Sequence, residues 1–376
     1  MGSSQALEER IAEAKSVIES CIGNSGIWAS SDVEDKTNSG YRGLIYLRDF
    51  AKGAIYGALA IGREDLVLKN LSNIKLKEDG SAPTYFIDEG FNWTADKIRR
   101  LKEDPLRKIV PYAWKFLMAR MGKLSPHSHT PWSTDPTLHY INAIITYAER
   151  TGNREILDAY GDDIEHALRF VKTQVDDVLY RGGDWRDNMR FKKGVALLSN
   201  NALLFRIYES LGYDDKAAEL KKIIQERFWR DPYHSDHPDT SHFDTFGQAM
   251  AVVHGVADKN QYGGITAKFR EMETEFGINA NDYDLSEMSM MARWRNKRVN
   301  QCGTLWEWAM AESILALEMM GKHEFARTAY NKWTSLKQFT EFHNPFTGEG
   351  MGAVNFMASA SLYLKVGREL GLVNKS

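Results

Sequence analysis

The sequence predicts an all-α protein built as an (α/α)6 barrel, a closed ring of six helical hairpins in a single domain. Three observations favour this fold. Apolar residues recur at helical spacing in about a dozen segments along the 376-residue chain. Tight turns such as Thr151-Gly152-Asn153 alternate with longer polar loops. No segment has the alternating pattern that predicts a strand.

The helical segments follow one another from end to end. Residues 5–21 place their apolar side chains on one helical face, behind a serine that can cap the helix. Residues 51–62 are rich in glycine and alanine, which permits close packing between helices. Further helices are predicted at 64–74, 106–121, 136–150, 154–176, 194–211, 214–229, 244–256, 261–274, 304–320, 323–339 and 351–370.

The long loops between these helices are predicted to gather at one end of the ring and to build a site there. They cover residues 22–43, 75–105, 123–135, 177–193, 230–243, 275–303 and 340–350. The alternative is an open helical solenoid, which periodicity alone does not exclude. The chain has no clear repeat consensus at a fixed period, and this disfavours the solenoid.

Composition narrows the class of protein. The chain is 43% hydrophobic and 26% charged, and no linker divides it, so residues 1–376 are interpreted as one domain. A net charge of −3, a pI near 6.4 and the lack of a long basic run argue against nucleic acid or an anionic membrane as partner. Two cysteines, no signal-peptide pattern and no apolar run of ~18 residues predict a soluble, cytoplasmic protein.

Two polar loops hold the residues with the most evident chemistry. The first, residues 181–190, begins with two glycines and places Asp184 and Asp187 three residues apart, around Trp185 and Arg186. An enzyme that cleaves a glycosidic bond needs a second carboxyl group across the sugar from the first. The second loop, residues 340–350, offers Glu341. The sequence therefore indicates a glycoside hydrolase.

Aromatic residues in the long loops favour the same class of substrate. Aromatic rings stack on the apolar faces of sugars, while charged groups bind the hydroxyls. These rings could also simply close the ends of a helical barrel, but as a set they favour carbohydrate. They are Trp28, Tyr41, Trp93, Trp132, Trp185, Trp294 and Phe346.

Five segments between about residue 40 and residue 368 carry a family resemblance in the same order. They are Ile45–Ala54, which contains Arg48-Asp49-Phe50; Trp132–Ile141, which contains Asp135; Asp184–Met189, followed by Gly194 and Asn200; Cys302–Trp308; and Glu341–Gly348, followed by Asn355–Ala360. They resemble inverting glycoside hydrolases with an (α/α)6 barrel, the group of processing α-glucosidases, trehalases, glycogen-debranching α-1,6-glucosidases and alkaline and neutral invertases.

The resemblance implies hydrolysis with inversion at the anomeric carbon. Asp184–Met189 is similar to the family segment that carries the general acid, and in that register the acid is Asp187. Glu341 matches the glutamate that is the general base in the processing α-glucosidases. No cofactor or metal is implied. The residues that we assign to substrate binding are Arg48, Asp49, Asp135, Trp185, Arg186, Trp306, Tyr41 and Trp132.

The chain departs from the family pattern at three points. Glu307 replaces a proline that commonly follows the tryptophan at Trp306, and Phe342-His343 replaces the usual tyrosine near Glu341. The chain is also shorter than most of the family. The expected substrate is an α-glucoside, either a short oligosaccharide or a small glucoside.

Each carboxylate also has a competing interpretation. Asp184 competes with Asp187 as the acid, and either aspartate could pair with Arg186 or cap a helix. Glu349 competes with Glu341 as the base. Arg48 and Asp49 could form an internal ion pair, and Arg186 could stabilise a negative neighbour instead of positioning substrate. Asp135 precedes Pro136 and so stands in an N-cap position.

Two other functions remain open. Sugar epimerases and isomerases also use this barrel, with paired histidines as acid and base, and His242, His254 or His343 could serve. A catalytically silent sugar-binding protein would keep the aromatic residues without needing the carboxylates. No histidine spacing matches a zinc site, and no phosphate-binding or nucleotide-binding loop is present.

Overall fold

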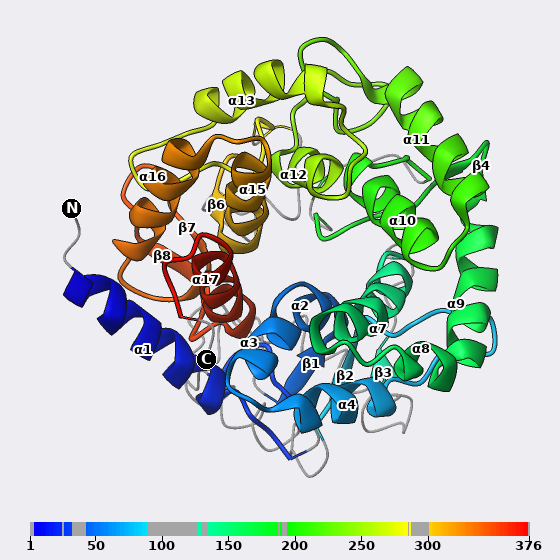
Figure 1. Ribbon diagram of the computed structural model, residues 1–376, viewed down its shortest axis with the longest axis horizontal. Coiled ribbons are helices and arrows are strands. Elements are labelled where there is room, and N and C mark those ends of the chain that lie inside the picture. Colours follow the sequence, from blue (N-terminus) through cyan, green and yellow to red (C-terminus); the bar gives the residue numbers. More distant parts are fainter. Residues whose placement is uncertain are drawn as a thin grey trace.

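The computed structural model describes residues 4–24, 26–31, 43–88, 127–128, 134–186, 189, 194–284, 286 and 301–374. Its helices lie in two concentric layers (Figure 1). The inner layer contains α2 (Leu47–Asp49), η1 (Phe50–Ala54), α3 (Ile55–Ala60), α7 (Pro136–Thr151), α10 (Leu198–Ser210), α12 (Thr245–Val253), α15 (Glu307–Met319) and α17 (Met357–Glu369). The outer layer contains α1 (Ser4–Ser20), α4 (Glu64–Asn73), α8 (Glu155–Ala159), α9 (Gly161–Thr173), α11 (Asp214–Phe228), η2 (Lys259–Gln261), α13 (Tyr262–Glu271) and α16 (His323–Thr334).

The inner helices form a closed ring. α3 packs against α17, α17 against α15, and the contacts continue through α12 and α10 to α7. α7 packs against η1, which runs directly into α3. The series of contacts therefore returns to its start, which an open solenoid would not do.

Burial separates the two layers. Every residue of α12 from Thr245 to Val252 is buried, as is every residue of α15 from Glu307 to Leu317. A helix that is buried all round belongs in the interior of a protein. By contrast, α9 buries only Ile164, Ala167 and Val171, a single stripe that faces the inner layer.

Small residues bring two inner helices unusually close, as the composition of residues 51–62 predicts. A Cβ atom added to Gly53 would lie 2.5 Å from Cα of Ala358 in α17. One added to Gly57 would lie 2.1 Å from Oγ of Ser361. Neither distance leaves room for a side chain, so the closure of the ring between η1, α3 and α17 depends on these glycines.

The tight turns lie where the sequence predicts them. Gly152, Gly212 and Gly321 follow α7, α10 and α15 with φ angles of 74°, 76° and 72°. Glycine adopts this left-handed conformation without strain and ends a helix abruptly. Each of these inner helices therefore turns at once into an outer one. The segment 154–176, predicted as one helix, is instead divided into α8 and α9.

The prediction that the chain has no strands is wrong. The described residues form three small antiparallel sheets: β1 (Leu44–Tyr46), β2 (Tyr85–Ile87) and β3 (His127–Ser128); β4 (Val175–Asp176) and β5 (Leu179–Tyr180); and β6 (Leu305–Trp306), β7 (Thr340–His343) and β8 (Gly350–Val354). Strands of two to five residues are too short to show a period in the sequence. β8 occupies the start of the segment 351–370 predicted to be helical, and α17 begins only at Met357.

Two further observations bear on the predictions. Among the helices of the described ranges, none is long and apolar enough to cross a membrane. The helix predicted at 106–121, and the residues Tyr41, Trp132 and Asp187, lie outside the residues that the structure describes.

Substitution of Gly53 tests the close approach of η1 and α17. Alanine favours a helix over glycine by about 1 kcal/mol, yet we expect Gly53→Ala to lower the free energy of unfolding by roughly 1–3 kcal/mol, because the added methyl group overlaps Ala358. Gly263 in α13 has no atom near its Cβ position, so Gly263→Ala should be neutral or stabilising. Urea unfolding of both variants measures the difference, and equal stability of Gly53→Ala and the wild type would contradict this packing.

Candidate active site

The predicted site residues that the structure describes lie on the segments that lead into the inner helices. Arg48 and Asp49 belong to α2, and Asp135 directly precedes α7. Trp185 lies in the loop before α10, and Trp306 is the last residue of β6, directly before α15. Glu341 lies in β7, on the segment that leads to α17. Residues far apart in the sequence thus meet at one end of the ring.

An ion pair joins two of these helix starts. Nε and Nη2 of Arg48 donate to the two carboxylate oxygens of Asp135 at 2.7 and 2.5 Å, and Nη2 also donates to the carbonyl of Asp184 at 3.0 Å. Burial by itself raises the pKa of Asp135, but Arg48 and His139 outweigh it and hold this pKa below its usual value. Asp135 makes no side-chain cap bond to α7. Its side chain therefore holds Arg48 in place, although the residue stands in the predicted N-cap position.

Asp49 has a different environment from its neighbour. It is half-buried and makes no hydrogen bond among the residues described. Burial raises the pKa of Asp49 to about 7, although Lys52 and Arg48 oppose the shift. Arg48 and Asp49 thus do not form the internal ion pair considered as an alternative, because Arg48 binds Asp135 instead. A carboxyl group at this position without a partner in the described structure is available to a ligand.

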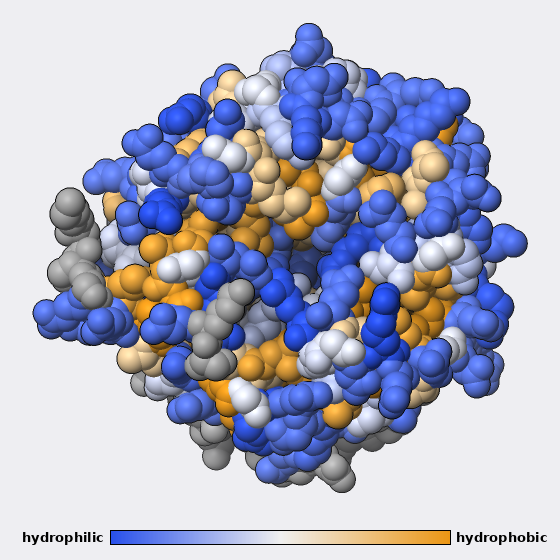
Figure 2. Space-filling view, viewed as in Figure 1, coloured by the Kyte–Doolittle hydropathy of each residue, from blue (hydrophilic) through white to orange (hydrophobic). Residues whose placement is uncertain are grey.

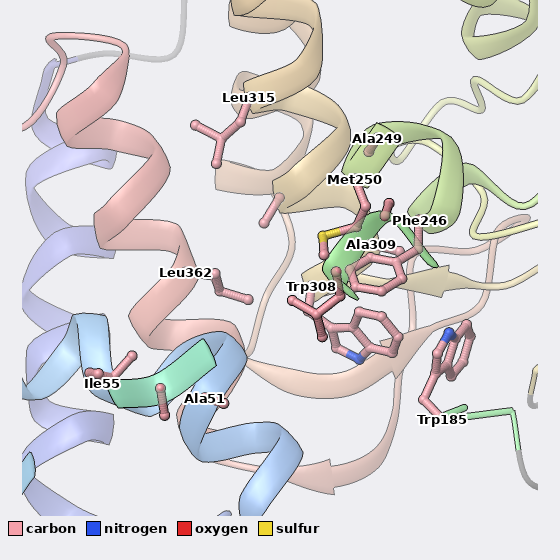
Figure 3. Packing of buried hydrophobic residues seen from close by; sticks show 14 of the residues in the cluster. Ala51, Ile55, Trp185, Phe246, Ala249, Met250, Trp308, Ala309, Leu315 and Leu362 are labelled. Carbon is pink, nitrogen blue, oxygen red and sulfur yellow. The ribbon is translucent and has the colours of Figure 1, made fainter. Parts of the chain in front are cut away.

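Aromatic rings form a layer behind these polar groups. Trp185 lies 4.9 Å from Trp306 and 4.4 Å from Trp308, measured between ring centroids. Trp306 stacks on Phe342 at 5.2 Å, and Phe246 meets Trp308 edge to face (Figure 3). Trp185 and Trp306 are only 5% and 6% exposed. They are therefore part of a packed aromatic cluster, of which little surface is left for stacking on a sugar.

Glu341 has a restricted position on β7. It is 9% exposed, and Oε2 accepts a hydrogen bond from the backbone nitrogen of Ala353 at 3.3 Å. Gly352 lies beside it with a φ of 76°, and a Cβ atom there would lie 2.5 Å from Oε2. Because only glycine fits at position 352, strand β8 can approach closely and hold the carboxylate.

Glu307 fixes the strand that carries Glu341. Oε1 of Glu307 lies 2.5 Å from Nε2 of His343 and accepts from the backbone nitrogen of Thr340 at 3.1 Å. Oε2 accepts from Nε1 of Trp333 in α16 at 2.7 Å. Thr340 and His343 are the two ends of β7. The glutamate that departs from the family pattern thus anchors β7 at both ends, a role that spacing in the sequence did not indicate.

Arg186 lies fully enclosed among three carboxylates. Its guanidinium donates to Asp184 and Asp236 at 2.8 Å and lies 3.4 Å from Asp244. The Arg186 side chain has no exposed surface. Of its two predicted roles, it therefore has that of stabilising negative neighbours. Asp184 is also bound by Ser199 and is 3% exposed. Of the interpretations of Asp184, pairing with Arg186 is the one observed.

The three histidines that a sugar epimerase or isomerase could use lie in three separate environments. His242 pairs with Asp282 at 3.0 Å and stacks on Tyr283. His254 ends α12 and faces the axis of the ring. His343 is completely buried against Glu307. Glu349, the rival base, is exposed. Within the described part of the chain, no group of histidine, cysteine and acidic residues has an arrangement that could hold a metal ion.

Comparison with solved structures finds this fold among glycosidases, in agreement with the family resemblance of the sequence. A wild-type glycosidase superposes with a TM-score of 0.64 at 17% identity, over 100% of both chains. A glycosidase variant in complex with glucose gives 0.66 at 15% identity, again over 100% of both. The GH63 mannosylglycerate hydrolase of Thermus thermophilus, also in complex with glucose, gives 0.68 at 11% identity over 95% of this chain and 99% of that one. At these identities the likeness establishes the fold.

Comparison of the sequence with family models and with curated proteins finds no relative. No family model matches the chain, and no curated protein matches it.

The carboxylates around Arg186 predict a pH-dependent stability. Burial raises the pKa of Asp244 to about 8; Asp236 and Asp184 add to the shift and Arg186 opposes it. In the unfolded chain this carboxyl group titrates near 4. The folded protein therefore holds a proton that the unfolded chain releases, and this group lowers stability as pH rises from about 4 to about 8.

Asp244→Asn should remove this dependence of stability on pH, because asparagine mimics the protonated acid. Asparagine can also still cap α12, as Asp244 does by accepting from the backbone nitrogen of Gly247. We expect the stability of the variant relative to wild type to increase from pH 5 to pH 8, by up to about 1.4 kcal/mol per pH unit, and then to level off. Urea unfolding across this range measures it. Asp236→Asn, which removes the negative charge and one of the two oxygens that accept from Arg186, should instead be destabilising by roughly 2–4 kcal/mol at pH 7. A pH-independent difference for Asp244→Asn would contradict the assignment.

Removal of the Glu307 carboxylate should loosen β7. Glu307→Ala leaves His343, Trp333 and the Thr340 nitrogen without their buried acceptor, so we expect a loss of roughly 3 kcal/mol in unfolding free energy. Glu318→Ala on the same helix removes a partly exposed pair with His323 and should cost less than about 1 kcal/mol. Equal losses in the two variants would show that Glu307 does not anchor the strand.

Proposed function

We propose that the protein is an inverting glycoside hydrolase with an (α/α)6 barrel, acting on an α-glucosidic bond of a short oligosaccharide or small glucoside. Asp187 is the general acid and Glu341 the general base. The observation that carries the proposal is the position of Glu341. It lies in β7, next to the aromatic cluster of Trp306 and Trp185, and Asp187 follows Trp185 by two residues in the sequence.

The reaction is a single displacement. Asp187, in its protonated form, gives its proton to the glycosidic oxygen while the bond from that oxygen to the anomeric carbon breaks. Glu341 takes a proton from water, which attacks the anomeric carbon from the opposite face. Inverting enzymes separate these carboxyl groups by ~6.5–9.5 Å to leave room for that water. The sugar released carries the inverted anomeric configuration.

Two residues on α2, Arg48 and Asp49, bind the cleaved sugar in this proposal, and Asp135 before α7 supports them. Arg48 is fixed by Asp135 on one side and by the carbonyl of Asp184 on another, so it presents a preorganised cation. Asp49 has no protein hydrogen bond in the part of the chain described and accepts one from a sugar hydroxyl. The pKa of Asp49, raised to about 7 by burial, then falls on binding, because a hydrogen bond to the carboxylate favours its charged form. Tyr41 and Trp132 complete the substrate-binding set.

The comparisons support a small substrate. The fold is similar to that of a hydrolase of mannosylglycerate, and two similar structures hold glucose. Both chains in that comparison are covered almost completely. These likenesses favour a short oligosaccharide or a small glucoside as substrate.

Two alternatives remain, a sugar epimerase or isomerase and a silent sugar-binding protein. The epimerase needs a pair of histidines across one sugar, and His242, His254 and His343 have three different sets of partners. This observation disfavours it. A binding protein would not need a carboxylate held as closely as Glu341 is held by Gly352 and Ala353.

The test follows the anomeric proton by NMR during hydrolysis of a panel of α-glucosides. The wild type should release the β-anomer first, and Asp187→Asn and Glu341→Gln should each lose activity by at least about 10³-fold, because each removes one partner of the acid–base pair. Glu349→Gln, an exposed neighbour of the base, serves as the matched control and should keep its activity. Initial release of the α-anomer would overturn single displacement. Conversion of a free sugar to an epimer or ketose, without hydrolysis, would favour the histidine mechanism.

A further inference from the structure

A cavity of about 380 Å³ runs along the axis of the ring and is lined by residues of η1, α3, α7, α10, α12, α15 and α17. It begins near Lys52, His139 and Trp308, in the first turns of η1, α7 and α15. It ends near Glu318 and Glu369, in the last turns of α15 and α17. In the view down the ring, a hollow edged by hydrophilic side chains lies at the centre (Figure 2).

This cavity is distinct from the candidate active site. None of the residues assigned to catalysis or substrate binding among those described lines it. The cavity and the candidate active site are separated by Lys52, Phe246 and Trp308. Nζ of Lys52 lies 4.0 Å from the Trp308 ring centroid and 4.4 Å from that of Phe246. Trp308 in turn packs on Trp185 of the candidate site. The aromatic layer is therefore the inner end of the cavity.

Polar groups without hydrogen-bond partners face this space. His139 and Asn142 lie one helical turn apart on α7 and are 3% and 5% exposed. Nδ1 of His139, Oδ1 of Asn142 and Nε2 of His254 have no partner in the described structure. Nζ of Lys52 and the hydroxyl group of Tyr56 make no hydrogen bond with any residue described. Native proteins rarely leave buried polar groups unpaired, so these groups point to bound molecules.

The hydrogen-bond donors and acceptors that line the cavity determine which ligands it can bind. Burial lowers the pKa of His139 to about 4, so the ring is neutral near pH 7. Its Nε2 faces Asp135, which leaves Nδ1 as an acceptor. Asn142 and Tyr56 can both donate and accept, and Lys52 donates. Hydroxyl groups, which do both, satisfy such a mixed set.

The remaining lining favours an uncharged ligand with an apolar face. Three ion pairs neutralise most of the charges that line the cavity: Arg206 with Glu149, Arg150 with Glu369 and Lys365 with Glu312. Met250, Leu315 and Leu362 supply apolar surface between them (Figure 3). Pockets for small molecules have this composition and volumes of ~300–1,000 Å³.

We propose that the axial cavity is a second binding site, which takes a small, neutral, polyhydroxylated molecule such as a monosaccharide or a polyol. Asn142, His139, Tyr56 and Lys52 bind its hydroxyl groups, and the apolar side chains contact its carbon skeleton. The ligand enters from the end of the ring where the inner helices end. The site does not depend on the proposed hydrolase activity, because its residues are separate from the catalytic set.

Methionine methyl groups allow both sites to be observed at once. Met250 lines the cavity, whereas Met351 lies opposite Phe342 in the strand pair that carries Glu341. In protein labelled with ¹³C at the methionine methyl groups, D-glucose and glycerol are titrated separately, and each resonance is assigned by Met→Leu substitution. We expect a saturable shift of the Met250 resonance with at least one probe. Binding in Asn142→Leu, which replaces the amide by an apolar group of similar size, should be about tenfold weaker or lost.

The outcomes separate the cavity from the hydrolase. A shift of Met351 alone, or a Met250 shift that Asn142→Leu does not weaken, overturns the cavity site and leaves the hydrolase proposal intact. A response of Met250 to glucose without one at Met351 supports the cavity site and counts against the active site. No response of Met250 to either probe also overturns the proposal. Tyr56→Phe, which removes only a hydroxyl group, provides a second variant should Asn142→Leu fail to fold.

A separate experiment tests the end of the ring at which the ligand enters the cavity. Met319 lines the cavity at the end of α15 and is 55% exposed, and both native cysteines, Cys21 and Cys302, are buried. A bulky maleimide on Met319→Cys should weaken the response of Met250 to the probes by about tenfold or more. The same label on Tyr213→Cys should leave that response unchanged, because Tyr213 is exposed and does not line the cavity. An equal response in both labelled proteins would contradict entry from this end.

Discussion

The ion pairs of Arg186 hold together the end of the ring where the candidate site lies. The guanidinium joins Asp184 in the loop before α10, Asp236 in the loop before α12, and Asp244 at the N-cap of α12. Tyr283 extends the group through a 2.6 Å hydrogen bond to Asp236. Because a buried charge is costly unless it is fully paired, these loops can pack only in the arrangement that satisfies it. Trp185 is carried by the same loop as Asp184 and Arg186, so the position of the aromatic cluster depends on these ion pairs.

The two ends of the ring differ in the length of the connections between the helices. At one end, glycines in the left-handed conformation, such as Gly152, Gly212 and Gly321, turn inner helices directly into outer ones, so the connections there are short. At the other end, the chain crosses from an outer to an inner helix through long segments, and short strands such as β6, β7 and β8 give these segments order. A carboxylate on a paired strand is held more firmly than one on a free loop. Glu341 gains that support from β8 and, through both ends of β7, from Glu307.

The sequence predicts the helices well and the finer features poorly, for identifiable reasons. Helical periodicity and the glycine turns reveal the inner and outer helices, because each signal is contained in a short window of the chain. The strands around Glu341 are too short for a period, and their pairing is set by residues about 35 positions apart, such as Trp306 and Phe342. The family resemblance brings Arg48, Asp49 and Asp135 to one site, and the structure places them together. It did not indicate that Arg186 is enclosed, because Asp236 and Asp244 reach it only through the fold.

Glu307 and the axial cavity show why polar residues in the interior are informative in this protein. A buried glutamate needs several donors, and Glu307 has them in His343, Trp333 and Thr340, so its polarity is explained by the structure itself. Asn142 and His139 lie equally deep, yet their side chains leave Oδ1 and Nδ1 without partners among the residues described. Gly53 and Gly57 lie where η1 and α3 meet α17, and a cavity remains along the axis of the ring. These unpaired groups, all within the described part of the chain, are the ones that the proposed ligand of the cavity would pair.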